Sequence, residues 1–425
     1  MPRDVFPYRF APPPPLPRYA RHRSEGEHPF RCLLHSIDYL RKYRRKVWEA
    51  SPDVASHFVK QQALMSAVAA EAPSGPALAF VGDLMWIRNG WDGFLDQAVL
   101  DYLNGHEAVV GNLETVISPR VSVAEWLPDR LRFNSRPELL TSFRRPDGRN
   151  TFAALSLANN HALDFGSRAL LDTLSLLSRE GIAQSGVRRR EDESPFALVE
   201  CGDVRVGFYA ATWRQRGSRG QPLLMNEIAG LERPEDGVDL DPARRALVEM
   251  AERGAEVRVV ALHWGYEYEM FPTPHQMQVA RELVCAGADI IVGTHPHVIQ
   301  PAEVCLVNGY ESGGGEFPPG SLLRSPDGRP RKALILYSLG NFATAMYTLS
   351  CRVGLIASVR FHRCSDGVDW SLPPWRLVAS VPRHGPAATR RLLFLEDWAR
   401  GASELRGEDS RELSRLRTHI TWRAR

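Results

Sequence analysis

Seven short apolar runs, separated by segments of helical periodicity, constrain the fold of this 425-residue chain more than any other feature. Runs of this length that end in Gly, Asn or Asp are typical of buried strands. Strands that alternate with helices indicate an α/β domain. Asp241–Pro242 and Thr273–Pro274 predict helix N-caps, and Gly181, Gly254 and Gly287 predict helix ends. The runs are "ALAFVGDLM", "AVVGNLET", "FAALSLANNH", "VRVGFYAATW", "VRVVALHWG", "ADIIVGTHPH" and "KALILYSLGNF".

Composition divides the chain into three parts. Residues 1–76 form a Pro-rich and basic extension, residues 77–385 the α/β domain, and residues 386–425 a charged tail with helical spacing. Within the extension, Pro12–Pro17 predicts extended backbone, and "CLLHSIDYLRKYRRKVWEA" predicts a helix with a basic face. That helix either packs on the surface of the main domain or contacts an anionic membrane or polymer.

The net charge of +3 gives no indication of nucleic-acid binding, so we expect no nucleic-acid partner. The six cysteines show no CxxC or paired spacing, which favours reduced, buried thiols over a disulfide framework or a zinc knuckle. The N-terminal residues lack the apolar core of a secretory signal, and no apolar run approaches the roughly 18 residues that a membrane span needs. We therefore expect no transmembrane segment and, by default, a cytoplasmic location.

Polar residues of metal-binding types follow most of the apolar runs, at the point where each predicted strand ends. Ligand sites in α/β sheets form beyond these carboxyl ends, so side chains distant in sequence converge there. Turn preferences account for isolated Asp or Asn residues but not for histidine. A shared metal site is therefore the better explanation. The candidates are Asp83, Glu114, Asn159, Asn160, His161 with Asp164, His263, His295, His297 and Asn341.

Imidazole combined with carboxylate and amide oxygens favours Zn, Mn, Fe or Ni over Mg or Ca. The lack of a cysteine ligand argues against a structural zinc. A bridging carboxylate such as Glu114 could hold two ions roughly 3.5–4 Å apart, the arrangement used in phosphoester hydrolysis. His161 would then be placed to protonate a leaving group. We expect one or two divalent ions (Mn, Zn or Fe) per chain.

The motifs "FVGDLM", "VVGNLET", "LANNHALDFG", "LHWGYEY", "GADIIVGTHPHVIQ" and "YSLGNF" resemble, in this order, those of the CapA family of poly-γ-glutamate or capsule synthesis proteins. That family is related to calcineurin-like metallophosphoesterases. The resemblance implies a metallophosphoesterase-like four-layer α/β/β/α sandwich, here with helical N- and C-terminal additions. It also implies a role for each motif residue: first metal ligand for Asp83, bridging carboxylate for Glu114, amide ligand for Asn160, catalytic histidine for His161, and histidine ligands for His263, His295 and His297.

The sequence departs from the phosphoesterase pattern at two positions. Those enzymes have a histidine two residues after the first aspartate, where this chain has Met85, and a thioether is a poor ligand for such metals. Their bridging aspartate is here the longer Glu114. A weak, mononuclear or differently selective centre is therefore expected. Trp213 and Arg214 replace a family motif and either contact substrate or, for Trp213, join the core. We also expect the chain to lack the N-terminal membrane anchor found in several members of that family.

Four further residues in these motifs have two interpretations each. Asp164 either orients the His161 imidazole or caps the helix that starts at "GSRALL". Glu267 either contacts substrate or pairs with a surface arginine. Asn341 and Asn159 either contact substrate or stabilise turns through their side chains.

Two functional hypotheses follow. The first is a CapA-like, metal-dependent hydrolase of capsule or poly-γ-glutamate metabolism, acting on a phosphoester, ester or γ-amide bond. Its partners would be an anionic polymer or phosphoester substrate and the capsule-synthesis machinery. The alternative is a non-catalytic assembly or transport factor that binds an anionic capsule polymer in the same cleft. Replacing His161 should abolish the function only under the first hypothesis.

Overall fold

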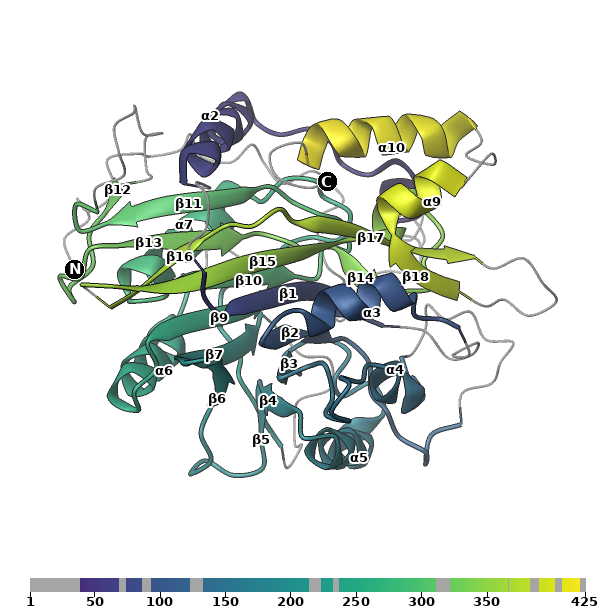
Figure 1. The fold of residues 1–425 in the computed structure, drawn as a ribbon, viewed down its shortest axis with the longest axis horizontal. Coiled ribbons are helices and arrows are strands. Elements are labelled where there is room, and N and C mark those ends of the chain that lie inside the picture. Colours follow the sequence, from purple (N-terminus) through teal and green to yellow (C-terminus); the bar gives the residue numbers. More distant parts are fainter. Residues whose placement is uncertain are drawn as a thin grey trace, which may run out of the picture.

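The predicted strands pair into two sheets that face each other across a shared core (Figure 1). The computed structural model describes residues 39–68, 74–85, 93–122, 133–213, 223–231, 237–310, 322–365, 367–382, 390–401 and 407–420. The Pro-rich stretch Pro12–Pro17 and Arg214 lie outside the described residues.

Among these residues, the first sheet contains β1 (Ala77–Leu84), β2 (Ala108–Leu113), β3 (Ala154–Ser156), β4 (Ala183–Ser185), β14 (Asn341–Ala343), β15 (Val353–Cys364), β16 (Gly367–Ser371), β17 (Arg376–Pro382) and β18 (Arg390–Phe394). The strand order is β18-β17-β15-β1-β2-β3-β4, with β14 also paired to β1 and β16 to β15. Strands β1 to β4 are parallel, whereas β15 to β18 pair antiparallel. The carboxyl ends of β1, β2 and β3 therefore share one edge.

The second sheet contains β6 (Phe196–Cys201), β7 (Val204–Thr212), β9 (Val257–His263), β10 (Ile290–Thr294), β11 (Ala302–Val307), β12 (Leu322–Leu323) and β13 (Arg331–Leu336). Its order is β12-β11-β13-β10-β9-β7-β6. The four adjacent strands at its centre, β13, β10, β9 and β7, are parallel to one another. Two short strands, β5 (Val187–Arg188) and β8 (Leu224–Met225), pair separately.

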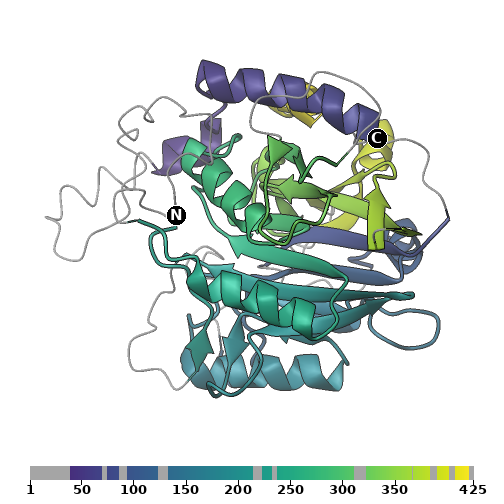
Figure 2. The ribbon, with the colours of Figure 1, turned by 90° about the vertical axis from the view of Figure 1, so that its left-hand side faces the viewer.

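Helices cover the outer face of each sheet, which gives the four-layer order expected from the sequence. Against the first sheet pack α3 (Gln97–Asn104), α4 (Glu138–Thr141) and α5 (Gly166–Arg179), through residues such as Leu103, Leu140 and Leu170. Against the second pack α6 (Asp241–Glu252) and α7 (Pro274–Cys285), through Leu247 and Leu283. Figures 1 and 2 both place α5 on the side of the molecule opposite α2 (Pro52–Val68). The predicted layered α/β sandwich is confirmed.

Helix ends follow the sequence signals with one shift. Thr273 caps α7 through a complete capping box with Gln276. Asp241 is instead the first residue of α6, and Leu240 occupies the N-cap without a side-chain bond. The glycines predicted to end helices take positive φ just past α5, α6 and α7, at Gly181 (67°), Gly254 (82°) and Gly287 (116°).

The basic helix of the extension packs on the main domain. Residues 39–45 are helical. Lys42 on this helix and Lys46 just after it are buried, while Arg44 and Arg45 are exposed. Val47 then forms a parallel bridge with Glu269. Of the two alternatives for this helix, the structure shows packing on the domain.

The C-terminal tail, expected to be helical from residue 386, first contributes an edge strand. β18 pairs antiparallel with β17 and is followed by α9 (Leu395–Gly401) and α10 (Gly407–Ile420). Leu413 and Leu416 of α10 join the core between the sheets, near the short helix α8 (Leu349–Arg352). Among the described helices, none combines the length and apolar composition that crossing a bilayer requires.

A buried charge cluster attaches α2 to the second sheet. Glu303 of β11 accepts a hydrogen bond from Arg281 Nε at 2.7 Å and one from the Tyr337 hydroxyl at 2.8 Å, and its second oxygen lies 3.2 Å from Nε2 of His57 on α2. Burial alone would raise the Glu303 pKa, but Arg281 and His57 outweigh it and lower this pKa to about 2. Breaking such a pair leaves an uncompensated charge in the interior.

We predict that Glu303→Gln lowers the free energy of unfolding by about 3–5 kcal/mol, because Arg281 stays buried without a carboxylate. Since the folded-state pKa lies below the ordinary value of 4.5, this contribution is present above pH 4.5 and is lost as the pH falls through about 2. Urea unfolding of the wild type and the variant, across this pH range, measures the difference in their free energies of unfolding.

The matched control is Glu249→Gln, which removes an exposed Arg253 pair and should change stability by no more than about 1 kcal/mol. An equally small effect of Glu303→Gln would show that the buried cluster does not stabilise the fold.

Candidate metal centre

Five strands bring the predicted ligands to one edge of the sandwich. Asp83 lies near the end of β1, Glu114 follows β2, and Asn160 and His161 follow β3 in the first sheet. From the second sheet come His263, the last residue of β9, and the turn His295–Pro296–His297 after β10. All of these side chains except Pro296 are buried polar groups.

The segment 337–341 runs from β13 of the second sheet to β14 of the first, and glycines let it lie directly against one strand of each sheet. A Cβ at Gly82 would lie 1.9 Å from the Gly340 carbonyl oxygen, and one at Gly293 would lie 1.8 Å from the Tyr337 carbonyl oxygen. The Asp83 amide donates to the Gly340 carbonyl at 3.1 Å. Close backbone approach thus positions Asp83 beside the β14 segment.

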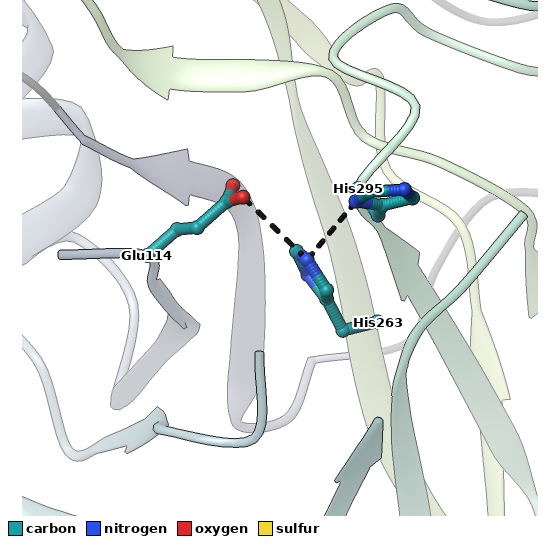
Figure 3. Close-up of side chains that lie close together, drawn as sticks. All are labelled: Glu114, His263 and His295. Carbon is teal, nitrogen blue, oxygen red and sulfur yellow. Dashed lines mark hydrogen bonds and ion pairs between the residues drawn. The ribbon is translucent and has the colours of Figure 1, made fainter. Parts of the chain in front are cut away.

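One group of ligands combines Glu114, His263 and His295 (Figure 3). His263 Nε2 lies 3.5 Å from Glu114 Oε1 and 3.2 Å from His295 Nδ1. The side-chain amide oxygen of Asn160, Oδ1, lies 2.9 Å from the same His263 nitrogen. Two imidazoles, a carboxylate and an amide oxygen form a donor set typical of Zn, Mn or Fe.

A second group combines Asp83, Glu114 and His297. His297 Nδ1 lies 3.4 Å from Asp83 Oδ2 and 3.8 Å from Glu114 Oε2. Glu114 therefore belongs to both groups, through a different oxygen toward each. Within either group, one ligand atom from each residue lies within 4.8 Å of the others.

The charge distribution fits a bound cation. Neither Glu114 oxygen accepts a hydrogen bond within the described part of the chain, although both are buried. Burial, together with the Asp83 and Glu267 carboxylates, raises the pKa of Glu114 well above its ordinary value. Burial lowers the pKa of His263 to about 3, which keeps its imidazole neutral. The neutral His263 imidazole and the buried Glu114 carboxylate beside it are groups that a divalent ion would satisfy. Despite their burial, Asp83 and His297 favour each other's charged forms, which lowers the pKa of Asp83 and raises the pKa of His297.

The His295–Pro296–His297 turn has an uncommon backbone. His295 has φ 94° and His297 has φ 57°, both in the left-handed region that favours glycine. Such conformations cost of order 1–3 kcal/mol each and cluster at functional sites. The turn directs both rings toward Glu114 from one strand end, as the spacing in the sequence indicated.

His161 and Asp164 form a pair next to these groups. His161 Nδ1 lies 2.8 Å from Asp164 Oδ2, and its Nε2 lies 3.9 Å from Glu114 Oε1. The edge of the Phe133 ring packs on the imidazole, with centroids 3.7 Å apart. The alternative of Asp164 as a helix cap is wrong, because Phe165 occupies the N-cap of α5 without a side-chain bond.

Met85 lies in the core between the sheets and is fully buried. Its amide donates to the Ala343 carbonyl at 2.8 Å. The position where a phosphoesterase carries a histidine thus contributes packing. The group of Asp83, Glu114 and His297 has one imidazole, whereas the other group has two.

The residues assigned to substrate contact differ in exposure. Asn159 and Asn341 are fully buried. Asn159 donates to the Leu113 carbonyl at 2.9 Å and accepts from the His161 amide at 3.1 Å. Asn341 Oδ1 lies 3.0 Å from His297 Nδ1. Both amides therefore hold neighbouring site segments, and substrate contact remains a prediction for them. Glu267 is 22% exposed and lies 3.7 Å from His297 Nε2.

Two site residues were not predicted. Asn112 donates to Asp83 Oδ1 at 2.7 Å, and the Thr294 hydroxyl lies 3.1 Å from His263 Nδ1. Asn112 precedes Glu114 by two positions, a spacing that was available in the sequence. Trp213, half-buried, packs partly on the second-sheet core, and its ring centroid lies 6.0 Å from that of His295.

The model of the family described as "Bacterial capsule synthesis protein PGA_cap" matches residues 77–346. This chain belongs to that family. The match starts at the first residue of β1 and ends shortly after β14, so it contains every predicted ligand. The CapA-family resemblance inferred from the motifs is confirmed.

Several named relatives agree with this membership. The chain is 28% identical over 319 residues to "PGA biosynthesis protein CapA" of Bacillus subtilis, covering 71% of this chain and 73% of that protein. It is 28% identical over 287 residues to "Capsule biosynthesis protein CapA" of Bacillus anthracis, covering 62% and 59%. A "Probable polyglutamine synthesis accessory protein" of Mycobacterium tuberculosis is 30% identical over 231 residues, covering 48% and 56%. The chain therefore spans less than two thirds of the latter two.

Solved structures resemble the chain more distantly. A "hypothetical protein" from Thermus thermophilus has a TM-score of 0.36 at 14% identity, covering 75% of this chain and 99% of that one. A "novel phosphatase" from Mycoplasma pneumoniae has a TM-score of 0.33 at 12% identity, covering 70% and 92%.

We predict that the purified protein contains Mn, Zn or Fe and that a His263→Ala, His295→Ala double variant loses it, because the variant removes both imidazoles of one group. Elemental analysis of both proteins measures this. His362→Ala, a partly buried histidine paired with Asp369 instead, should keep the wild-type metal content. Equal metal in the double variant and the wild type would place the ion elsewhere.

Proposed function

We propose that this PGA_cap family member is a metal-dependent hydrolase of capsule or poly-γ-glutamate metabolism that acts on a phosphoester, ester or γ-amide bond. The observation that carries the proposal is the position of Glu114. Its two buried oxygens face one histidine-containing group each, and the His161–Asp164 pair stands beside them. A bridging carboxylate with an adjacent acid–base pair suits the hydrolysis of such bonds.

The residues of the site have different roles in the proposed reaction. Asn160, His263, His295 and Glu114 would hold one ion, and Asp83, Glu114 and His297 a second. A bound ion supplies a hydroxide-like water near neutral pH and stabilises negative charge on the substrate. Because His161 Nδ1 faces Asp164, its Nε2 is directed toward Glu114 and can give a proton to the leaving group. The Asp164 carboxylate fixes the tautomer and stabilises the protonated ring.

The two ligand groups should differ in affinity. The group of His263 and His295 has two imidazoles, whereas the group of His297 has one, because Met85 packs in the core. Imidazole is a favourable ligand for Zn and Fe, so the group with two imidazoles should hold these ions more tightly. We therefore propose one firmly held ion and a second, weaker one per chain.

The non-catalytic alternative remains supported by one observation, the loss of an imidazole at Met85. A centre weakened in this way could bind carboxylates of an anionic capsule polymer without cleaving it. The name of the mycobacterial relative, a probable accessory protein of polyglutamine synthesis, is consistent with such a role for that relative. Under either proposal the partners are an anionic substrate or polymer and the capsule-synthesis machinery.

We predict that His161→Asn lowers turnover by about 10²–10⁴-fold, because it removes the general acid, while the metal content stays unchanged. The assay uses metal-loaded protein with bis(p-nitrophenyl) phosphate, a p-nitrophenyl ester and γ-glutamyl p-nitroanilide. Asp164→Asn should lower turnover less, since the imidazole remains.

Ser175→Ala, on the exposed face of α5, is the control and should keep full turnover. If the metal-loaded wild type cleaves none of these substrates and still binds poly-γ-glutamate, the assembly role is the correct one. Equal turnover by His161→Asn and the wild type would remove His161 from the mechanism.

A further inference from the structure

The segment from Tyr266 to Met270 connects the metal centre to the N-terminal extension, a part of the chain that precedes the family match at residue 77. On one side, the Tyr268 amide donates to the Pro296 carbonyl at 2.8 Å, which joins the segment to the histidine turn. On the other side, the Val47 amide donates to the Tyr268 carbonyl at 2.9 Å, and the Met270 amide donates to the Val47 carbonyl at 2.9 Å. A continuous backbone connection thus runs from the extension to the turn.

Glu267, on this segment, faces the outer nitrogen of a candidate ligand. His297 directs Nδ1 toward Asp83 and Glu114, and its Nε2 lies 3.7 Å from Glu267 Oε1. Metal-binding histidines generally give their second N–H to a carboxylate or carbonyl, which fixes the ring and raises its basicity. Glu267 lies on that side of the ring, at ion-pair distance from Nε2.

Side chains of the extension hold the same segment. Lys42 Nζ donates to Glu269 Oε1 at 2.7 Å, and the Tyr39 and Tyr268 hydroxyls share a hydrogen bond of 2.6 Å. Lys46 Nζ lies 5.0 Å from the centre of the Tyr268 ring. Burial and the nearby Glu267 carboxylate raise the pKa of Tyr39, so its hydroxyl stays protonated and able to donate.

The backbone of the segment also needs support. Tyr268 has φ 68°, a left-handed conformation in a residue with a bulky side chain. Such a conformation is unfavourable and persists only where the surroundings impose it. The ring, hydroxyl and both backbone groups of Tyr268 are all contacted, by Tyr39, Tyr43, Val47 and Pro296.

We propose that residues 39–47 of the extension complete the metal centre by holding the 266–270 segment so that Glu267 orients the His297 imidazole. Glu267, Tyr39 and Lys42 are thus positioning residues, and the extension acts on the site through them. This inference rests on the proposed metal centre. It assigns the extension a task at the site, where the sequence alone offered surface packing or contact with a membrane or polymer.

The test is Mn²⁺ binding to the full chain by calorimetry, with the melting temperature of each variant recorded alongside. Glu267→Gln should raise the Mn²⁺ dissociation constant by about 10–100-fold, the usual effect of removing such a carboxylate. A Tyr39→Phe, Lys42→Met double variant should raise it about 10-fold, since Glu267 is then held less firmly. Combining all three substitutions should add little to Glu267→Gln, because they act through the same carboxylate.

Arg44→Ala, on the exposed face of the same helical segment, is the matched control and should bind Mn²⁺ like the wild type. Tyr39→Phe alone removes one hydroxyl and serves if the double variant does not fold. Wild-type Mn²⁺ affinity in both Tyr39→Phe and the Tyr39→Phe, Lys42→Met double variant would overturn the inference while leaving the metal centre intact. A loss of Mn²⁺ affinity in the double variant that adds fully to the loss caused by Glu267→Gln would do the same. Failure of the wild type to bind Mn²⁺ would contradict the proposed centre and this inference with it.

Discussion

The candidate site depends on one buried carboxylate, Glu114, which is shared by two candidate ligand groups that each combine residues from both sheets. Both of its oxygens are buried, and within the described residues neither accepts a hydrogen bond. Burying an ionised carboxylate without partners is costly, so this arrangement is stable only if the group takes up a proton or a cation. The neutral His263 imidazole beside it and the negative charge of Asp83 favour a cation, since a metal ion satisfies these groups together.

The fold supplies this arrangement through strand ends. In each sheet the central strands are parallel, so their carboxyl ends meet at one edge, and the two edges face each other. Gly82 of β1 and Gly293 of β10 lie directly against the segment 337–341, which connects the two sheets. The left-handed backbone at His295, His297 and Tyr268 is the local cost of aiming these side chains, and the packing around each residue compensates for it. Stability and function are thus coupled at the same turn.

Most of the site could be predicted from the sequence, because each ligand lies in a short motif directly after an apolar run. The packing around it could not. Both roles considered for Asp164 were compatible with its position three residues after His161, and only the conformation of Phe165 decides between them. The contact of Lys42 with Glu269 joins residues 227 positions apart, which no local pattern encodes. The strand β18 was missed because its charged sequence also suits a helix.

The central claim, that Glu114 is shared between two ligand groups, is tested most directly by anomalous diffraction from crystals of the full chain soaked in Mn²⁺. The account predicts one anomalous peak bonded to Glu114, His263 and His295, and a second bonded to Glu114, Asp83 and His297. A Glu114 carboxylate that contacts no ion at saturating Mn²⁺, with its oxygens hydrogen-bonded to water or protein instead, would contradict the account.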